Sequence, residues 1–232
     1  MAKKILVFLT VIVLAFGVAA AVFIKNSFYK LDVTQEVLSA QRILGVADEM
    51  PFDYIDTLGD TITLEDTIET AGLIVRVKAT DEIQYREYTI VRKVAVVQTY
   101  KGACAEEIFI AEPVFINFVG TEERSGIYPN EGYNLMQPQG EYLLFLTKLP
   151  TAEKRIETDA ESRTYLVVNK AFGKYQYGQT APTPVIEWGS PEEPFPSFTY
   201  TDVADYEILT TSLEFYNAYF AWKQEALALY PK

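Results

Sequence analysis

Residues 88–100 read YTIVRKVAVVQTY, and this stretch gives the strongest indication of the fold. β-Branched and aromatic side chains dominate it, and such residues favour extended strands. Its even-numbered positions are mostly apolar, but Arg92 interrupts them. We therefore expect a β-bulge near Arg92–Lys93 that shifts the alternation and bends the strand. The turn Lys101-Gly102 ends it.

Further strands are expected on both sides of this segment. Upstream, Thr63 and Asp66 have the spacing of a helix start, Gly72 closes the helix, and Leu73–Val77 follows as a strand. Downstream, the predicted strands are Ile108–Ile116 with a bulge or edge at Pro113, Glu141–Lys148, and Thr164–Tyr177 bent at Gly173. Five bent strands at this spacing, with a helix beside them, predict a mainly β fold built on a small closed barrel.

The C-terminal part reads as a strap followed by a helix. Residues 179–200 are rich in proline, which predicts an extended segment laid over the barrel. Thr211-x-x-Glu214 is a capping box that opens a helix. Its apolar residues form a wide stripe, so we expect the helix to pack on the barrel. The stripe comprises Leu213, Tyr216, Phe220 and Leu227, flanked by Phe215, Tyr219 and Trp222.

The N-terminal segment Ile5–Ile24 is uncharged and follows Lys3 and Lys4. As a helix it would be roughly 30 Å long, the thickness of a bilayer's hydrocarbon core. Two interpretations stay open: a retained signal anchor, or a signal peptide cleaved after Ala19-Ala20-Ala21. Because the apolar run continues to Ile24, we expect a single-pass anchor over residues 1–24, with the rest of the chain extracytoplasmic.

The expected organisation has four parts. The anchor (1–24) is followed by a connector (25–62) with a short helix over 34–49. The barrel covers residues 63–178, and the strap and C-terminal helix cover 179–232. Two long loops, Asn117–Gly140 and Pro150–Arg163, are candidates for function.

Charge and composition exclude several functions. The chain has 20 basic and 32 acidic residues, and residues 1–24 hold two of the basic ones, so the remainder carries a net charge of 18 − 32 = −14. Such a surface repels phosphate backbones, and we expect no nucleic-acid partner. The chain has no histidine and one cysteine, Cys104. This excludes Ser-His-Asp and Cys-His catalysis, the usual zinc sites and an internal disulfide.

Four pieces of the chain resemble a known family. They are Leu64–Val77 (LEDTIETAGLIVRV), the strand and turn VQTYKG ending at Gly102, Gly140–Leu146 (GEYLLFL), and Tyr165–Val168 with Gly173. Together they resemble bacterial extracytoplasmic OB-fold domains similar to the N-terminal domain of the tissue inhibitors of metalloproteinases, over about residues 63–178. The resemblance implies an OB-like five-stranded barrel and little about activity. The inhibitors chelate zinc through a free N-terminal cysteine, which has no counterpart here.

Candidate site residues are few. Tyr128, Tyr133 and Trp188 lie in loop-like stretches, where aromatic faces suit a sugar or peptide ligand, although covering the barrel end is their alternative role. The acidic pairs 106–107, 122–123 and 192–193 and the cluster Asp53, Asp56 and Asp60 are expected to be solvated, without a catalytic or metal role. We expect no cofactor.

Three hypotheses for function follow from these observations. The first is a non-catalytic binding module for an extracytoplasmic protein, peptide or envelope polymer. The second is a carboxylate-dependent hydrolase of the cell envelope, and the third is a structural subunit that docks through its C-terminal helix. Two carboxylates that converge in a pocket would favour the hydrolase, whereas a large exposed apolar patch on the helix would favour docking.

Overall fold

The structure is a computed structural model, and it describes residues 17, 40–45, 47, 62–86, 89–117, 126–150, 158–178, 185–186 and 198–232. Contacts divide the chain into two units, residues 1–32 and 33–232. Apart from Gly17, the predicted anchor lies outside the described residues. Within the described part of the chain, no helix is long and apolar enough to cross a membrane.

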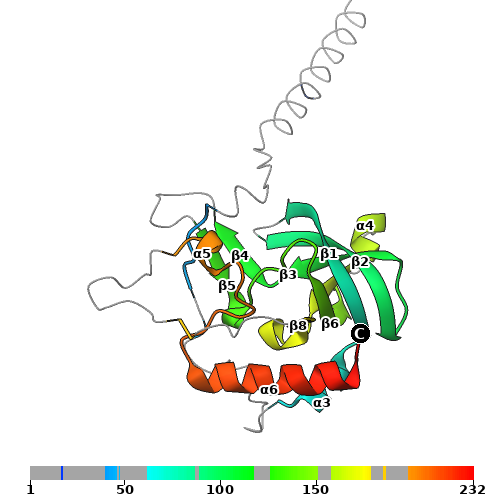
Figure 1. The fold of residues 1–232 in the computed structure, drawn as a ribbon. Helices are drawn as coiled ribbons and strands as arrows, with labels where there is room; N and C mark the ends of the chain where they lie inside the picture. Colours follow the sequence, from blue (N-terminus) through cyan, green and yellow to red (C-terminus); the bar gives the residue numbers. More distant parts are fainter. Residues whose placement is uncertain are drawn as a thin grey trace, which may run out of the picture. The chain divides into compact units, whose positions relative to one another are not determined.

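A closed five-stranded β-barrel forms the core of the second unit (Figure 1). The antiparallel strands β1 (Leu73–Arg86), β2 (Thr89–Lys101) and β3 (Glu107–Glu112) follow one another. β3 then runs parallel to β7 (Thr164–Val167), which pairs antiparallel with β6 (Glu141–Lys148). β6 closes the ring by pairing antiparallel with β1. The mainly β barrel predicted from the strand spacing is confirmed.

The β1–β2 ladder has a register shift at the predicted place, opposite Arg92–Val94, but β2 is not the strand that bulges, and its alternation continues through Arg92. Ile90, Arg92 and Val94 are all fully buried, and β2 pairs with β3 in an unbroken register over this stretch. The irregularity lies on the opposite strand, between Ala79 and Ile83 of β1. The arginine occupies an inward position because a buried carboxylate, described below, compensates its charge.

Pro113 divides the predicted third strand in two. The barrel strand β3 ends at Glu112, and β4 (Val114–Asn117) leaves the barrel to pair with β5 (Gly126–Pro129) in a separate two-stranded sheet. A proline cannot donate a ladder hydrogen bond, which explains why the chain changes sheets there. The 3₁₀ turn η3 (Asn130–Gly132) follows β5.

The predicted fifth strand is also divided. β7 is followed by the 3₁₀ turn η4 (Lys170–Gly173). β8 (Lys174–Gln176) then pairs with β6 farther along the edge that β7 occupies, because β1 occupies the opposite edge. The bend falls at Gly173, as predicted. A Cβ atom at Gly173 would lie 1.8 Å from the carbonyl oxygen of Val168, so the turn has no room for a side chain.

Two longer helices accompany the barrel. α3 (Leu64–Thr70) begins at Thr63, whose hydroxyl accepts from the backbone N–H of Asp66, as predicted. α6 (Leu213–Leu229) begins at Ser212, one residue after the predicted cap at Thr211, and its hydroxyl accepts from the N–H of Phe215. The short helices α4 (Asp159–Ser162) and α5 (Tyr200–Val203) complete the described elements.

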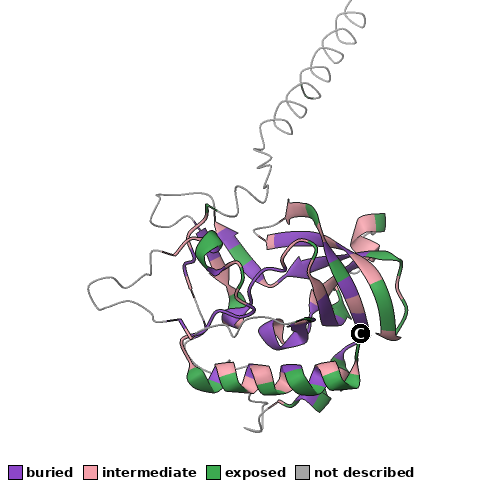
Figure 2. Ribbon diagram, viewed as in Figure 1, coloured by how far each residue is buried: buried purple, intermediate pink, exposed green. Residues whose placement is uncertain are grey.

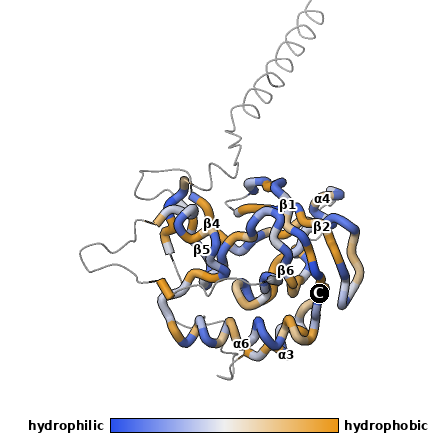
Figure 3. Tube along the Cα trace, in the orientation of Figure 1, coloured by the Kyte–Doolittle hydropathy of each residue, from blue (hydrophilic) through white to orange (hydrophobic). Residues whose placement is uncertain are grey.

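The buried face of α6 differs from the predicted stripe. Leu213 is 63% exposed, and Tyr216, Phe220 and Leu227 are only half-buried. The face that packs inward comprises Phe215, Tyr219, Lys223 and Ala226. Figure 2 shows the remaining face of α6 largely exposed, and Figure 3 shows how hydrophobic and hydrophilic residues alternate along it. The four central residues of the predicted stripe are therefore wrong, whereas Phe215 and Tyr219, which were expected to flank it, form the buried face.

Beside the barrel, distant segments meet through single β-bridges. Arg42 bridges Thr199, Ile43 bridges Ile127, Ala47 bridges Thr210, and Tyr133 bridges Ile208. We call the described residues of 40–47, 114–136 and 198–212 the bridged flank. The helix predicted over 34–49 is wrong for residues 42, 43 and 47, which form these extended contacts instead.

Candidate functional site

The β4–β5 hairpin presents two aromatic rings on its outer face. Phe115 and Tyr128 are directly opposite each other across the hairpin, and their ring centroids are 5.9 Å apart with a 56° tilt. Their neighbours Ile116 and Ile127 point inward and are buried. Phe115 is 49% exposed, so much of its ring is accessible at the surface.

A pocket of about 290 Å³ lies beside this aromatic pair. A pocket of this volume is at the lower end of the range for small-ligand sites. No residue that lines it in the described part of the chain carries a charge. The lining residues are Pro113, Val114, Phe115, Tyr128, Pro129 and Asn130.

Hydrogen bonds to backbone carbonyls hold the segments around the pocket in place. The N–H of Asn130 donates to the carbonyl of Pro113 at 3.1 Å, and the N–H of Tyr133 donates to the carbonyl of Asn130 at 3.1 Å. The hydroxyl of Tyr85 donates to the carbonyl of Ile116 at 3.2 Å, which ties the hairpin to β1. The pocket is therefore formed by ordered strands rather than by a loop.

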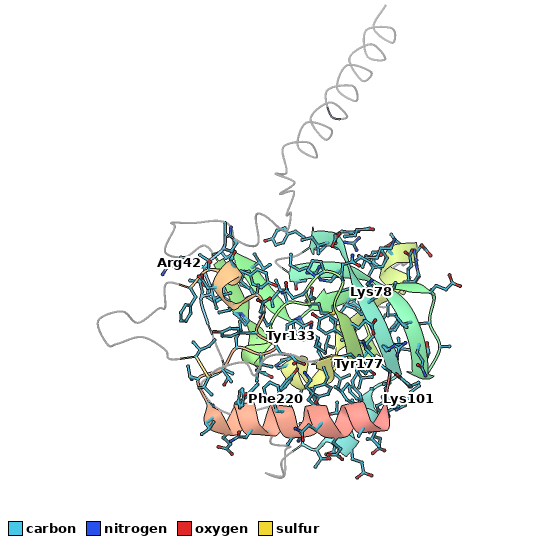
Figure 4. The ribbon with its side chains drawn as sticks, in the orientation of Figure 1. Arg42, Lys78, Lys101, Tyr133, Tyr177 and Phe220 are labelled. Atoms are coloured by element: carbon cyan, nitrogen blue, oxygen red, sulfur yellow. The ribbon has the colours of Figure 1, made fainter. Side chains whose placement is uncertain are left out.

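The three aromatic residues predicted for a ligand site have different positions. Tyr128 lines the pocket. Tyr133 is fully buried between the β4–β5 hairpin and the barrel, where its hydroxyl donates to Glu112 at 3.1 Å (Figure 4). Trp188 lies outside the described residues. The structure therefore brings only Tyr128 to the pocket, together with Phe115, which the sequence analysis missed.

A buried ion pair joins the barrel to the bridged flank. Arg92 on β2 donates through Nε to Glu112 Oε1 on β3 at 2.7 Å, and both side chains are fully buried. Glu112 Oε2 accepts from the Tyr133 hydroxyl and, at 2.8 Å, from the backbone N–H of Met136. Burial lowers the pKa of the Arg92 guanidinium and Glu112 raises it, and the net shift is upward. Burial, with Glu112 second, raises the pKa of Tyr133 well above its ordinary value.

A second buried ion pair joins the bridged flank to α6, and its carboxylate also contacts β8. Glu207 pairs with Lys223 on α6, and it also accepts from the hydroxyl of Tyr219 at 2.7 Å and the N–H of Gln176 at 2.7 Å. Tyr219 is fully buried, and burial followed by Glu207 raises its pKa well above the ordinary value.

Lys174 lies between these two pairs. Its ammonium donates to the carbonyl of Asn134 and lies 4.2 Å from the centre of the Tyr133 ring. No carboxylate of the described residues is within ion-pair distance of it, and burial lowers its pKa to about 8. We call Arg92, Glu112, Lys174, Glu207 and Lys223 the buried charge network.

The carboxylates do not form a pair suited to hydrolysis in the described part of the chain. Glu112 and Glu207 are buried, each held by a cation and by further donors, and neither lines the pocket. Glu106 and Glu107 are exposed. The pairs 122–123 and 192–193 and the cluster Asp53, Asp56 and Asp60 lie outside the described residues.

The described residues also contain neither a metal-binding cluster nor a cysteine paired with a catalytic partner. These residues contain no group of three or more histidine, cysteine, aspartate or glutamate side chains that could hold a metal ion. Cys104 is half-buried, and its sulfur lies 3.8 Å from the hydroxyl of Thr99.

Comparison with protein-family models and with curated protein sequences returns no match. The function must therefore be inferred from the residues of the chain itself.

Proposed function

We propose that this chain is a non-catalytic binding module that faces the outside of the cell and binds a protein, peptide or envelope polymer at the Phe115–Tyr128 pocket. The observation that carries the proposal is the outward aromatic pair beside an uncharged pocket on ordered strands. Aromatic rings together with a few polar groups in a preformed recess are typical of ligand sites. The buried charges are engaged within the interior, which favours a structural role for them.

The barrel of this module is OB-like in our proposal. The ring order β1-β2-β3-β7-β6, with one parallel pair between β3 and β7, supports it. In sequence, the segments Leu64–Val77 and Gly140–Leu146 resemble the bacterial domains similar to tissue inhibitors of metalloproteinases. Since fold does not imply activity, the binding role rests on the pocket alone.

Membrane attachment through residues 5–24 is the second part of the proposal. The uncharged run of 20 residues after Lys3 and Lys4 supports it. The module would then act at a membrane surface, where a high effective concentration of partners strengthens weak binding.

Capture of partners by the full-length chain tests the binding site. We expect material captured from solubilised membranes to be lost with Phe115→Ala, because truncating a central aromatic anchor costs about 2 kcal/mol or more of binding free energy. Leu213→Ala is the matched control, since Leu213 is also an exposed large apolar residue but lies on α6.

Three outcomes of the capture experiment are distinguishable when the melting temperatures of both variants match that of the parent. Loss with Phe115→Ala alone supports the proposal. Loss with Leu213→Ala alone favours docking through α6. Capture unchanged in both variants overturns the pocket as the binding site.

A further inference from the structure

We infer that the Phe115–Tyr128 pocket binds a lysine or arginine side chain from a basic segment of a partner protein. This inference rests on the proposed function and deepens it, since it names the chemistry of the ligand. Two features of the described residues, the rings and the polar groups at the pocket, support it together with the net charge of residues 25–232.

The rings suit a long side chain with an apolar stem. Phe115 and Tyr128 are tilted by 56°, and Pro113, Val114 and Pro129 extend the apolar lining beside them. Lysine and arginine lay their methylene stems along such surfaces while the charged head reaches outward. Ring faces also attract the cation itself.

The polar groups at the pocket can accept hydrogen bonds. The hydroxyl of Tyr128 and the side-chain amide of Asn130 form no hydrogen bond with any other described residue, and both residues line the pocket. A hydroxyl and an amide oxygen each accept from an ammonium or guanidinium donor. The pocket thus offers acceptors for the charged head next to an apolar surface for the stem.

The net charge of the chain favours a cationic ligand over the neutral and anionic ligands that could contact the same two rings. Residues 25–232 carry a net charge of −14, from 18 basic and 32 acidic residues. Such a field concentrates cations and repels anions. A sugar or a neutral proline-rich peptide could contact the same rings but gains nothing from this field, and an anionic polymer is repelled by it.

The test uses the full-length chain in neutral detergent and a fluorescent Gly-Ser peptide series. One central residue is lysine, arginine, glutamine or glutamate, and binding is measured by anisotropy at low and high salt. We expect the lysine and arginine peptides to bind about tenfold more tightly than the glutamine peptide, and the glutamate peptide to bind most weakly. Salt should reduce this preference without abolishing it.

Variants separate the pocket from general charge attraction. Tyr128→Ala and Phe115→Ala should abolish the preference for lysine over glutamine, Tyr128→Phe should reduce it in part, and Leu213→Ala should leave it unchanged. Equal binding of the glutamine and lysine peptides, binding of no peptide, or a preference that persists in Tyr128→Ala would each overturn the inference. If partner capture still depends on Phe115 in those cases, the pocket remains a binding site and only its ligand chemistry is wrong.

Discussion

The barrel and the bridged flank both contain fully buried side chains, but different interactions hold them in place. In the barrel, Phe145 is buried within β6, which pairs with β1 over six consecutive residue pairs. In the flank, Ile208 and Leu209 are equally buried, yet their segment meets its neighbours through single bridges such as Tyr133 with Ile208. The barrel therefore relies on continuous ladders, whereas the flank joins its short β4–β5 ladder to the other segments through isolated bridges.

Because its segments meet through single bridges, the flank needs additional buried interactions to fold together with the barrel. A ladder adds hydrogen bonds one after another once its register is set. A single bridge such as Ala47 with Thr210 orders two segments for very few bonds, so it needs other buried interactions to offset the entropy of ordering them. The contacts of Glu112 with Tyr133 and Met136 supply such an interaction, because they link a barrel strand to the flank.

The largest effect is expected from Glu112→Ala. The substitution leaves Arg92 buried without its carboxylate and removes the acceptor of Tyr133 and of the Met136 N–H. Breaking a buried ion pair in this way costs about 3–5 kcal/mol. Urea unfolding at neutral pH should therefore show a large loss of stability.

Glu107→Ala is the control for this substitution, because Glu107 is on the same strand but its side chain is 51% exposed in a surface pair with Lys93. It should cost about 0–1 kcal/mol. Similar losses of unfolding free energy for the two variants would contradict a structural role for the Arg92–Glu112 pair. They would also show that the contacts of Glu112 do not stabilise the flank.

A second comparison lies within α6. Phe215 is fully buried and packs its ring 4.9 Å from that of Phe172, whereas Phe220 is half-buried beside Tyr216. We expect Phe215→Ala to cost about 3–5 kcal/mol and Phe220→Ala about 1 kcal/mol. Thermal unfolding of the two variants measures the difference.

The same pair of variants also tests the docking hypothesis for α6. If Phe220→Ala melts like the parent but loses captured partners, the outer face of α6 is a binding surface. If Phe220→Ala destabilises as much as Phe215→Ala, the observed orientation of the helix is incorrect.

The sequence predicted those parts of the fold that repeat a local signal. Strand β6 was predicted with its observed bounds, and α3 begins at the predicted cap, because strand alternation and helix capping depend on residues that are close in the sequence. The bridges of the flank carry no such signal, since each joins residues that are far apart in the chain. The inward positions of Arg92 and Lys223 could not be predicted for a related reason: a buried cation is explained only by a carboxylate that is distant in the sequence.

The candidate site was predicted in part. Tyr128 was found because it lies in a loop-like stretch, but Phe115 was assigned to the barrel strand and was not singled out. Its position could have been found from Pro113, because a strand that leaves the sheet at a proline exposes a new face.

The last prediction concerns Lys174, which lies where the barrel, the flank and α6 meet. Its folded-state pKa is about 8, lowered mainly by burial, with Glu112 and Glu207 opposing that shift and Arg92 and Lys223 adding to it. The ordinary pKa of a lysine in an unfolded chain is about 10.4. Between these values the unfolded chain binds more protons than the folded chain, so stability must rise with pH.

We expect the free energy of unfolding to increase by about 2 kcal/mol between pH 7.5 and pH 9.5 through this group. Above about pH 10 the trend should reverse, because burial raises the pKa of Tyr133 and Tyr219 and unfolding then releases their protons. Urea titrations of the parent and of Lys174→Met measure the effect, with Lys78→Met as the control because Lys78 is exposed on β1. The rise should disappear in Lys174→Met and persist in Lys78→Met. A rise of equal size in all three proteins would show that the pH dependence does not come from Lys174.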